Sequence, residues 1–168
     1  MRYLTLALLS SLLAMPIFAG CGDDDPVSSS ENSRSAKPVF GIGVTEAGEC
    51  APKPNGIPSR MVGDLEGCFY SFPGSDECLP GGAYRATGTN LFVGTYHGEA
   101  GTFETPSLFT AKFEDCTLVK EITGHCEHPI IVGTGTGVFA GVTGILLMDD
   151  IIEAGTYTGY TYTGDLQW

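Results

Sequence analysis

The segment 124–129, which reads GHCEHP, carries three side chains of the kinds that bind zinc: His125, Cys126 and His128. Imidazole nitrogens and thiolate sulfurs are common zinc ligands, but the ligands must converge on one point. If this segment is a strand, His125 and His128 lie on opposite faces and cannot both reach one ion. We therefore expect a disulfide cysteine and two solvated histidines here, with no metal and no other cofactor.

Acidic side chains gather after the apolar run ILLM, where Asp149, Asp150 and Glu153 follow. Adjacent residues of a strand point to opposite faces, so Asp149 and Asp150 do not make an acid–base pair like that of glycosidases. One of them can face a barrel interior, although a solvated strand end explains the group better. The sequence also lacks G-x-S-x-G, H-E-x-x-H and EF-hand patterns. No catalytic constellation is evident, which favours a protein that is not an enzyme.

A further group of polar and aromatic side chains are candidates to line a barrel interior. Its members are Tyr84, Arg85, Tyr96, His97 and Glu99. The sequence alone does not decide which of them point inward.

The glycine-rich segment 132–144, VGTGTGVFAGVTG, contains a match to the dinucleotide-binding pattern G-x-G-x-x-A at 135–140. That pattern needs a helix after it, whose N-terminus meets the pyrophosphate. Here β-branched residues and further glycines follow, and a phosphate-binding loop would need a lysine where none occurs after Lys120. We therefore expect this segment to bind no nucleotide. It should instead form a turn and strand junction with Phe139 buried in the core, built on the glycines Gly133, Gly135, Gly137, Gly141 and Gly144.

The elements around these residues are short segments with period-two alternation. The sequence holds 24 glycines, and turn signals separate its alternating segments. In 107–115 three apolar side chains alternate with polar ones, and the last segment, 155–168, alternates in the same way. No segment has the 3.6-residue periodicity of an amphipathic helix. These patterns predict an all-β domain, a barrel or a sandwich, and a patterned last strand favours a closed barrel.

The segment GTGTGVFAGVTG, an acidic strand and then GTYTGYTYTG resemble the last strands of the allene oxide cyclase barrels. Dirigent proteins share that architecture and a similar glycine segment. The resemblance covers 132–168 and rests on the glycines and Phe139, which serve the fold and not catalysis. It implies a single small antiparallel, calycin-like β-barrel of about eight strands. The catalytic residues of the cyclases cannot be placed on this sequence, so their activity is not carried over.

Five cysteines follow Cys21, and in an exported protein they are expected to form disulfides. The shortest connections pair Cys68 with Cys78 across a turn cluster, and Cys116 with Cys126 across a hairpin. Cys50, which lies in a proline- and glycine-rich loop, is then left without a partner.

The N-terminal segment 1–20 has a basic start, an apolar stretch and small residues at its end, as in an export signal. It ends in FAG before Cys21, which resembles the lipobox of bacterial lipoproteins, although Phe18 stands where that family usually has an aliphatic residue. We predict cleavage and lipidation at Cys21, an acidic, serine-rich tether over 21–38 and a barrel over 39–168. If the host has two membranes, Gly22 after Cys21 favours the outer one.

The formal net charge of −12 argues against partners that need a basic patch, such as nucleic acids. The sequence thus predicts a membrane-anchored lipoprotein whose barrel binds a small apolar ligand or a partner. A structural envelope protein and a cyclase-like enzyme remain alternatives. The sequence does not determine the oligomeric state.

Overall fold

The computed structural model describes residues 35–45 and 48–168. The predicted signal, the predicted lipidation site at Cys21 and all but the last residues of the predicted tether lie outside the described residues. The regular structure is β throughout, in the strands β1 (Lys37–Val44), β2 (Ile57–Gly63), β3 (Leu65–Leu79), β4 (Ala83–Tyr96), β5 (Glu99–Phe113), β6 (Glu121–Pro129), β7 (Thr136–Gly137), β8 (Thr143–Glu153) and β9 (Thr156–Gln167). None of these described segments forms a helix long and apolar enough to cross a bilayer.

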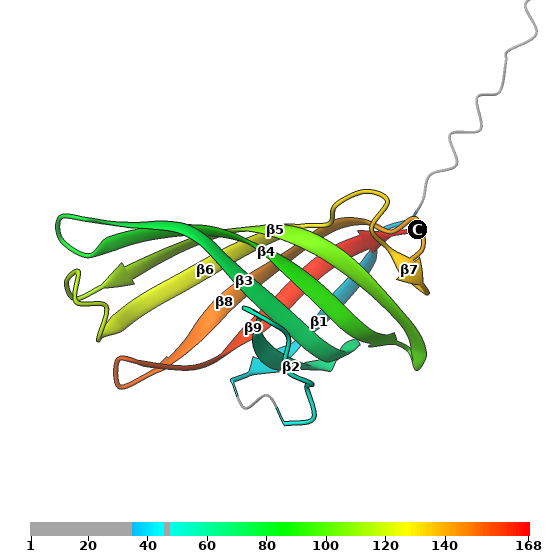
Figure 1. Ribbon diagram of the computed structural model, residues 1–168, viewed down its shortest axis with the longest axis horizontal. Coiled ribbons are helices and arrows are strands. Elements are labelled where there is room, and N and C mark those ends of the chain that lie inside the picture. The colour runs from blue at the N-terminus through cyan, green and yellow to red at the C-terminus, as the bar shows by residue number, and fades with distance from the viewer. Residues whose placement is uncertain (1–34, 46–47) are drawn as a thin grey trace, which may run out of the picture. The chain divides into compact units, whose positions relative to one another are not determined.

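Eight of the strands close into an antiparallel barrel (Figure 1). Each strand from β1 to β6 pairs with the next, β6 pairs with β8, β8 with β9, and β9 returns to β1. The two-residue strand β7 pairs with β5 at the barrel end where the chain terminates. The predicted eight-stranded antiparallel barrel is confirmed, with its first strand beginning at Lys37 rather than at Val39.

Two tight hairpin turns set the register of the long strands. His97 and Gly98 connect β4 to β5, and Ala154 and Gly155 connect β8 to β9. All four have positive φ, between 51° and 83°. Two consecutive residues with positive φ make the turn whose twist suits a two-residue hairpin, which keeps the paired strands aligned over their length.

One end of the barrel is filled with aromatic rings, and the glycine-rich segment covers it. Phe139 is fully buried, with its ring centroid 5.5 Å from that of Phe92 and 5.0 Å from that of Phe103. Trp168 lies beside it and donates a hydrogen bond to the Val138 carbonyl. The prediction of a turn and strand junction is confirmed, because β7 and its flanking turns occupy the segment, and φ is positive at Gly133, Gly137, Gly141 and Gly144.

The inward face of β1 carries glycines because tyrosine rings of β9 lie across it. Gly41 is paired with Tyr162 and Gly43 with Tyr160, and a Cβ at either glycine would overlap the ring of its partner. The Tyr162 hydroxyl accepts a hydrogen bond from the Leu65 amide (2.9 Å) and donates one to the Leu65 carbonyl (3.1 Å). These hydrogen bonds fix the Tyr162 ring inside the barrel.

The disulfide pairing predicted from the sequence is wrong. Cys50 is bonded to Cys68, and Cys78 to Cys116, while Cys126 is free. The barrel brings together cysteines that are 18 and 38 residues apart. Cys68 and Cys78 lie on the same extended strand, β3, so they are too far apart to bond to each other. Cys126 lines the barrel interior, whereas Cys116 is exposed in the connection after β5.

Candidate functional site

The other end of the barrel is hollow. A cavity of about 570 Å³ occupies it, which lies within the usual range of small-molecule sites. The inward positions of the strands here carry small side chains where the filled end has rings. These small residues are Ser59, Ser71, Ala86, Gly88 and Ser107. The hollow therefore follows from side-chain size at the inward positions.

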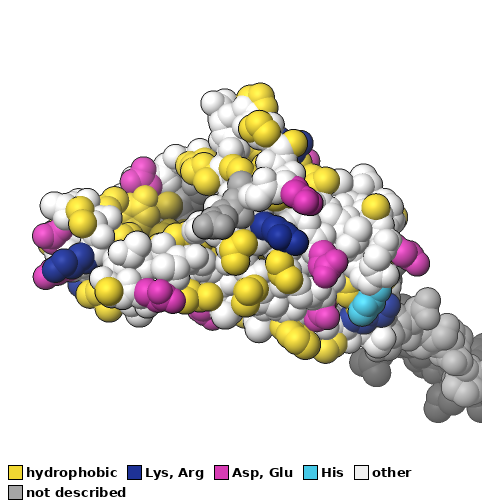
Figure 2. Space-filling view, turned by 90° about the horizontal axis from the view of Figure 1, so that it is seen from below, with side chains coloured by type: hydrophobic (Ala, Val, Ile, Leu, Met, Phe, Trp, Pro, Cys, Tyr) yellow, Lys and Arg dark blue, Asp and Glu magenta, His cyan; other side chains and the backbone are white. Residues whose placement is uncertain are grey.

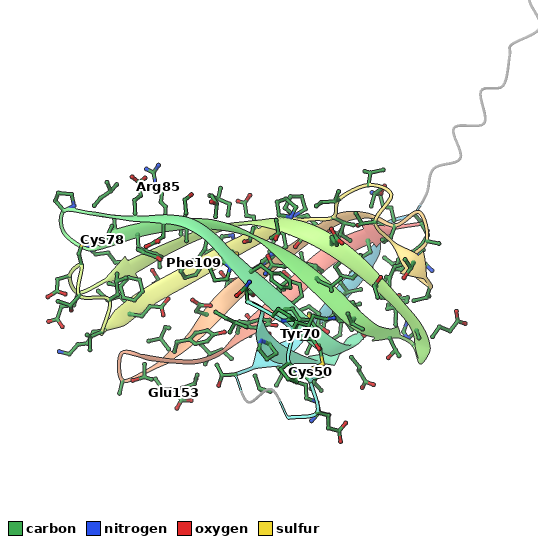
Figure 3. The ribbon with its side chains drawn as sticks, in the orientation of Figure 1. Cys50, Tyr70, Cys78, Arg85, Phe109 and Glu153 are labelled. Atoms are coloured by element: carbon green, nitrogen blue, oxygen red, sulfur yellow. A yellow bond between two sulfur atoms is a disulfide. The ribbon has the colours of Figure 1, made fainter. Side chains whose placement is uncertain are left out.

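Apolar and aromatic side chains supply most of the remaining wall: Phe69, Phe72, Phe109, Phe113, Met148 and Tyr84. Phe109 points into the barrel interior, whereas Arg85, on the neighbouring strand, points away from it (Figure 3). Figure 2 shows hydrophobic side chains interspersed with polar and charged ones on the face that carries the β1–β2 connection. The cavity is therefore suited to an apolar molecule of modest size.

The cavity opens where β1 and β2 end before their neighbours β9 and β3. The outer parts of β3 and β9 extend past β2 and β1, because Phe72–Leu79 pairs only with β4 and Thr156–Tyr157 pairs only with β8. Ile57 and Pro58, at the start of β2, line the cavity between these two edges. The Cys50–Cys68 disulfide ties the β1–β2 connection to β3 beside this opening.

The inner end of the cavity holds two buried polar residues, His128 and Asn90. Burial lowers the pKa of His128 to about 4, so its imidazole is neutral at pH 7. Its Nδ1 lies 3.4 Å from the Thr105 hydroxyl, and Phe69 packs edge-on against its ring. Asn90 donates a hydrogen bond to Ser71 (2.8 Å), and its Oδ1 has no partner. The expectation that His128 is solvated is therefore wrong.

Two carboxyl groups meet on one wall of the cavity, Glu121 of β6 and Asp150 of β8. A Cβ at Gly124 would overlap an oxygen of each, so both groups lie against the same bare stretch of backbone. Burial raises the pKa of Asp150 to about 8, helped by hydrogen bonding and repulsion from the Glu121 carboxylate. Two adjacent carboxyl groups in a partly dry site hold a proton at neutral pH because both cannot ionise cheaply.

A β-bulge aims Glu121 into the cavity. Lys112 pairs with Thr123 and Phe113 pairs with Glu121, so Ile122 is an extra residue on β6. Such an insertion shifts the alternation of the strand by one position. As a result Glu121 is only 8% exposed, whereas Ile122 is 53% exposed on the outer surface.

The remaining reactive side chains of the cavity are held in their neutral forms. Burial raises the pKa of the Cys126 thiol to about 12, and the acidic neighbours Asp150 and Glu127 raise it further. Burial also raises the pKa values of Tyr157 and Tyr160. The Tyr160 hydroxyl hydrogen-bonds with Ser59 (2.9 Å). Neither an activated thiolate nor a phenolate is available at neutral pH, so these groups donate hydrogen bonds or pack.

The structure separates the metal-ligand candidates as the alternation predicts. His125 is on the outer surface, where its Nδ1 lies 2.7 Å from Asp149, while His128 is inside. Within 35–45 and 48–168, no group of three or more histidine, cysteine or acidic side chains could hold a metal ion. The prediction that Asp149 and Asp150 face opposite ways is confirmed, but Asp150 belongs to the cavity and not to a solvated strand end.

Of the other candidates only Tyr84 lines the cavity. Tyr96 is buried in the filled end, stacked on Trp168 at 5.1 Å. Arg85, His97 and Glu99 are exposed, and Glu153 lies exposed beside the turn between β8 and β9 (Figure 3). Glu121 and Asn90 also line the cavity, although neither was predicted from the sequence. Asn90 alternates in phase with the inward-facing Phe92, a signal that could have found it, whereas the bulge hides Glu121 from any such pattern.

Comparisons with models of protein families, with curated proteins and with solved structures find no match to this chain. The class of protein is therefore defined by the fold and the site themselves. It is a small antiparallel β-barrel with one filled end and one hollow, mainly apolar end that contains two adjacent carboxyl groups. The resemblance to the allene oxide cyclase barrels stays a prediction.

Proposed function

We propose that this chain is a membrane-anchored barrel lipoprotein that binds a small, mainly apolar ligand in its hollow end. The cavity of about 570 Å³ carries the proposal. An interior that served only to support the fold would be filled throughout, as the end around Phe139 is. An apolar pocket with a few convergent polar groups is the usual form of a small-molecule site.

A ligand panel tests this proposal. Fatty acids and aromatic metabolites are added to the full chain, and thermal unfolding is followed with each. A ligand at one hundred times its Kd stabilises the folded state by about 2.7 kcal/mol, which raises the melting temperature by several degrees. Absence of a shift with every compound supports the structural reading of the barrel instead.

A matched pair of variants shows whether binding occurs in the cavity. Ala86 lines the cavity on β4, and Ala83 is exposed on the outer face of the same strand. Ala86→Trp fills the hollow and should abolish the thermal shift. Ala83→Trp adds the same ring outside and should leave the shift unchanged. Equal loss in both variants would place the binding elsewhere.

The membrane anchor is the second part of the proposal, and it rests on the sequence up to Cys21. The two disulfides support export, since such bonds persist mainly in oxidising compartments. Intact mass should show loss of residues 1–20 and gain of acyl chains on Cys21, and Cys21→Ser should release the protein from the membrane fraction. An unmodified protein with another N-terminus would contradict the anchor.

An acid–base enzyme of the isomerase or cyclase type is the second candidate function, and Asp150 favours it. A carboxyl group with a pKa of about 8 in a cavity can both give and take a proton near neutral pH. Product analysis over the same ligand panel distinguishes the two functions. Turnover that Asp150→Asn abolishes supports the enzyme, whereas binding without products supports the binding protein.

A further inference from the structure

Two buried side-chain atoms in the described part of the chain lack a hydrogen-bond partner, Asn90 Oδ1 and Glu121 Oε1. Both residues line the cavity, and they are 3% and 8% exposed. Buried polar atoms are nearly always hydrogen-bonded in folded proteins. The amide oxygen of Asn90 can only accept a hydrogen bond, and Glu121 Oε1 accepts one when its carboxyl group is ionised, so a ligand that completes this site brings donors.

The cavity also lacks a positive charge to balance its carboxyl groups. None of its described lining residues is Lys or Arg. Lys120, next to Glu121 in sequence, instead forms an exposed ion pair with Glu114 at 2.9 Å. A cationic donor forms hydrogen bonds to a carboxylate that are about twice as strong as neutral ones. The wall around Glu121 and Asp150 is thus built to accept a cation that the chain does not supply.

The rest of the wall suits the apolar body of such a ligand. The same cavity is lined by the aromatic side chains of Tyr84, Phe109, Phe113 and Tyr157. Aromatic faces bind apolar groups and also attract a nearby ammonium group. The carboxyl groups and the aromatic lining therefore select complementary parts of one amphipathic molecule.

We propose that the ligand carries a basic amine, whose ammonium group is bound between the carboxyl groups of Glu121 and Asp150. This inference rests on the proposed binding function. The ammonium group donates hydrogen bonds to both carboxyl groups, and the proton that the pair held in the empty cavity is released to solvent. The apolar body extends along the aromatic wall.

The proton release predicts how affinity depends on pH. Burial and Glu121 hold the pKa of Asp150 near 8, so binding should strengthen as the pH rises from 6 to 9. The other titratable groups facing the cavity are the neutral Tyr84, Tyr157, Tyr160, Cys126 and His128. His128 is already neutral at pH 6, because its pKa is about 4. Asp149 faces outward against His125, which leaves the carboxyl pair as the group that changes charge.

Three probes that share one carbon frame test the proposal: 4-phenylbutylamine, 4-phenylbutanol and 4-phenylbutyrate. Calorimetric titration into the full chain at pH 8.5 should show the amine binding at least tenfold more tightly than the alcohol. The carboxylate should bind more weakly than both. Glu121→Gln and Asp150→Asn should each reduce amine affinity about tenfold and leave alcohol affinity unchanged. Glu127→Gln, an equal charge change on the outer face of β6, should alter neither.

The outcomes separate this inference from the function beneath it. An alcohol that binds as tightly as the amine, or amine binding that is unaffected in both cavity variants, overturns the amine while leaving a binding cavity in place. If none of the three probes binds, the proposed binding function fails and the amine inference with it. Thermal unfolding of each variant shows that it is folded before its affinity is compared.

Discussion

The two ends of this barrel are built from the same strands and differ in what fills them. On β4 and β5 the inward cross-strand pair at the filled end is Phe92 with Phe103, stacked at 5.0 Å. Four residues further along each strand the inward pair is Gly88 with Ser107. The hydrogen-bonded wall continues unchanged through both levels. The difference shows that the wall and the cavity are specified separately, the first by alternation and the second by side-chain volume.

The polar groups follow the same division. In the filled end the Tyr162 hydroxyl both accepts and donates a backbone hydrogen bond. In the hollow end Asn90 Oδ1 and Glu121 Oε1 are buried without partners. An unpartnered buried polar atom costs about 1–3 kcal/mol, so the hollow end gives up stability that the filled end must supply. That trade is typical of a site whose missing partner is a ligand.

Truncation of one aromatic ring at each end of the barrel should separate the two ends most clearly in the free energy of unfolding. Phe139→Ala should lower the free energy of unfolding by about 3–5 kcal/mol, since it opens a void among packed rings. Phe109→Ala, at the cavity wall, should cost less than about 1.5 kcal/mol because its ring already borders a hollow. Urea denaturation measures both. Equal losses would mean that the two ends of the barrel are packed alike.

Removal of the Cys78–Cys116 disulfide should give the next largest effect. This bond ties the outer end of β3 to the connection after β5, at the hollow end. Its 38-residue separation predicts a loss of about 2–4 kcal/mol in the Cys78→Ser, Cys116→Ser double variant.

Cys126→Ser is the control for this variant, because Cys126 is free, and it should cost less than about 1 kcal/mol. Peptide mapping without reduction checks the pairing directly. A Cys116–Cys126 peptide would show that the hollow end is closed differently.

A smaller effect is expected from Asp150→Asn, and it depends on pH. The folded-state pKa of Asp150 is about 8, above the unfolded value of about 3.9, so the folded protein binds the extra proton. The contribution of Asp150 to stability is therefore largest below about pH 4 and is lost as the pH rises toward 8. Since Asp150 is partly exposed, we expect about 1–2 kcal/mol.

The window between pH 6.5 and 8 isolates this effect. His128, whose pKa is lowered to about 4, contributes the opposite slope only between pH 4 and 6.5. Asp150→Asn should remove the fall between pH 6.5 and 8 in a series of urea titrations. A profile in the variant as steep as in the parent chain would assign the fall to another group.

Local sequence patterns are enough to predict the wall of the barrel. Period-two alternation and glycine turns predicted antiparallel strands, and the pattern around Phe139 predicted its burial, because these signals are local and each depends on a few neighbouring residues. The same local rule separated His125 from His128 and Asp149 from Asp150.

The cysteine pairing and the contact between the two acidic residues depend instead on how the strands come together in the fold. Cys50 and Cys68 come within 5.6 Å between their Cα atoms because the loop before β2 folds back on β3. Glu121 reaches Asp150 because one extra residue, Ile122, reverses the inward and outward alternation at the start of β6. Both results depend on the pairing of segments distant in sequence, and a bulge is placed by the partner strand as much as by its own residues. Local sequence patterns therefore predict neither the cysteine pairing nor the contact between Glu121 and Asp150.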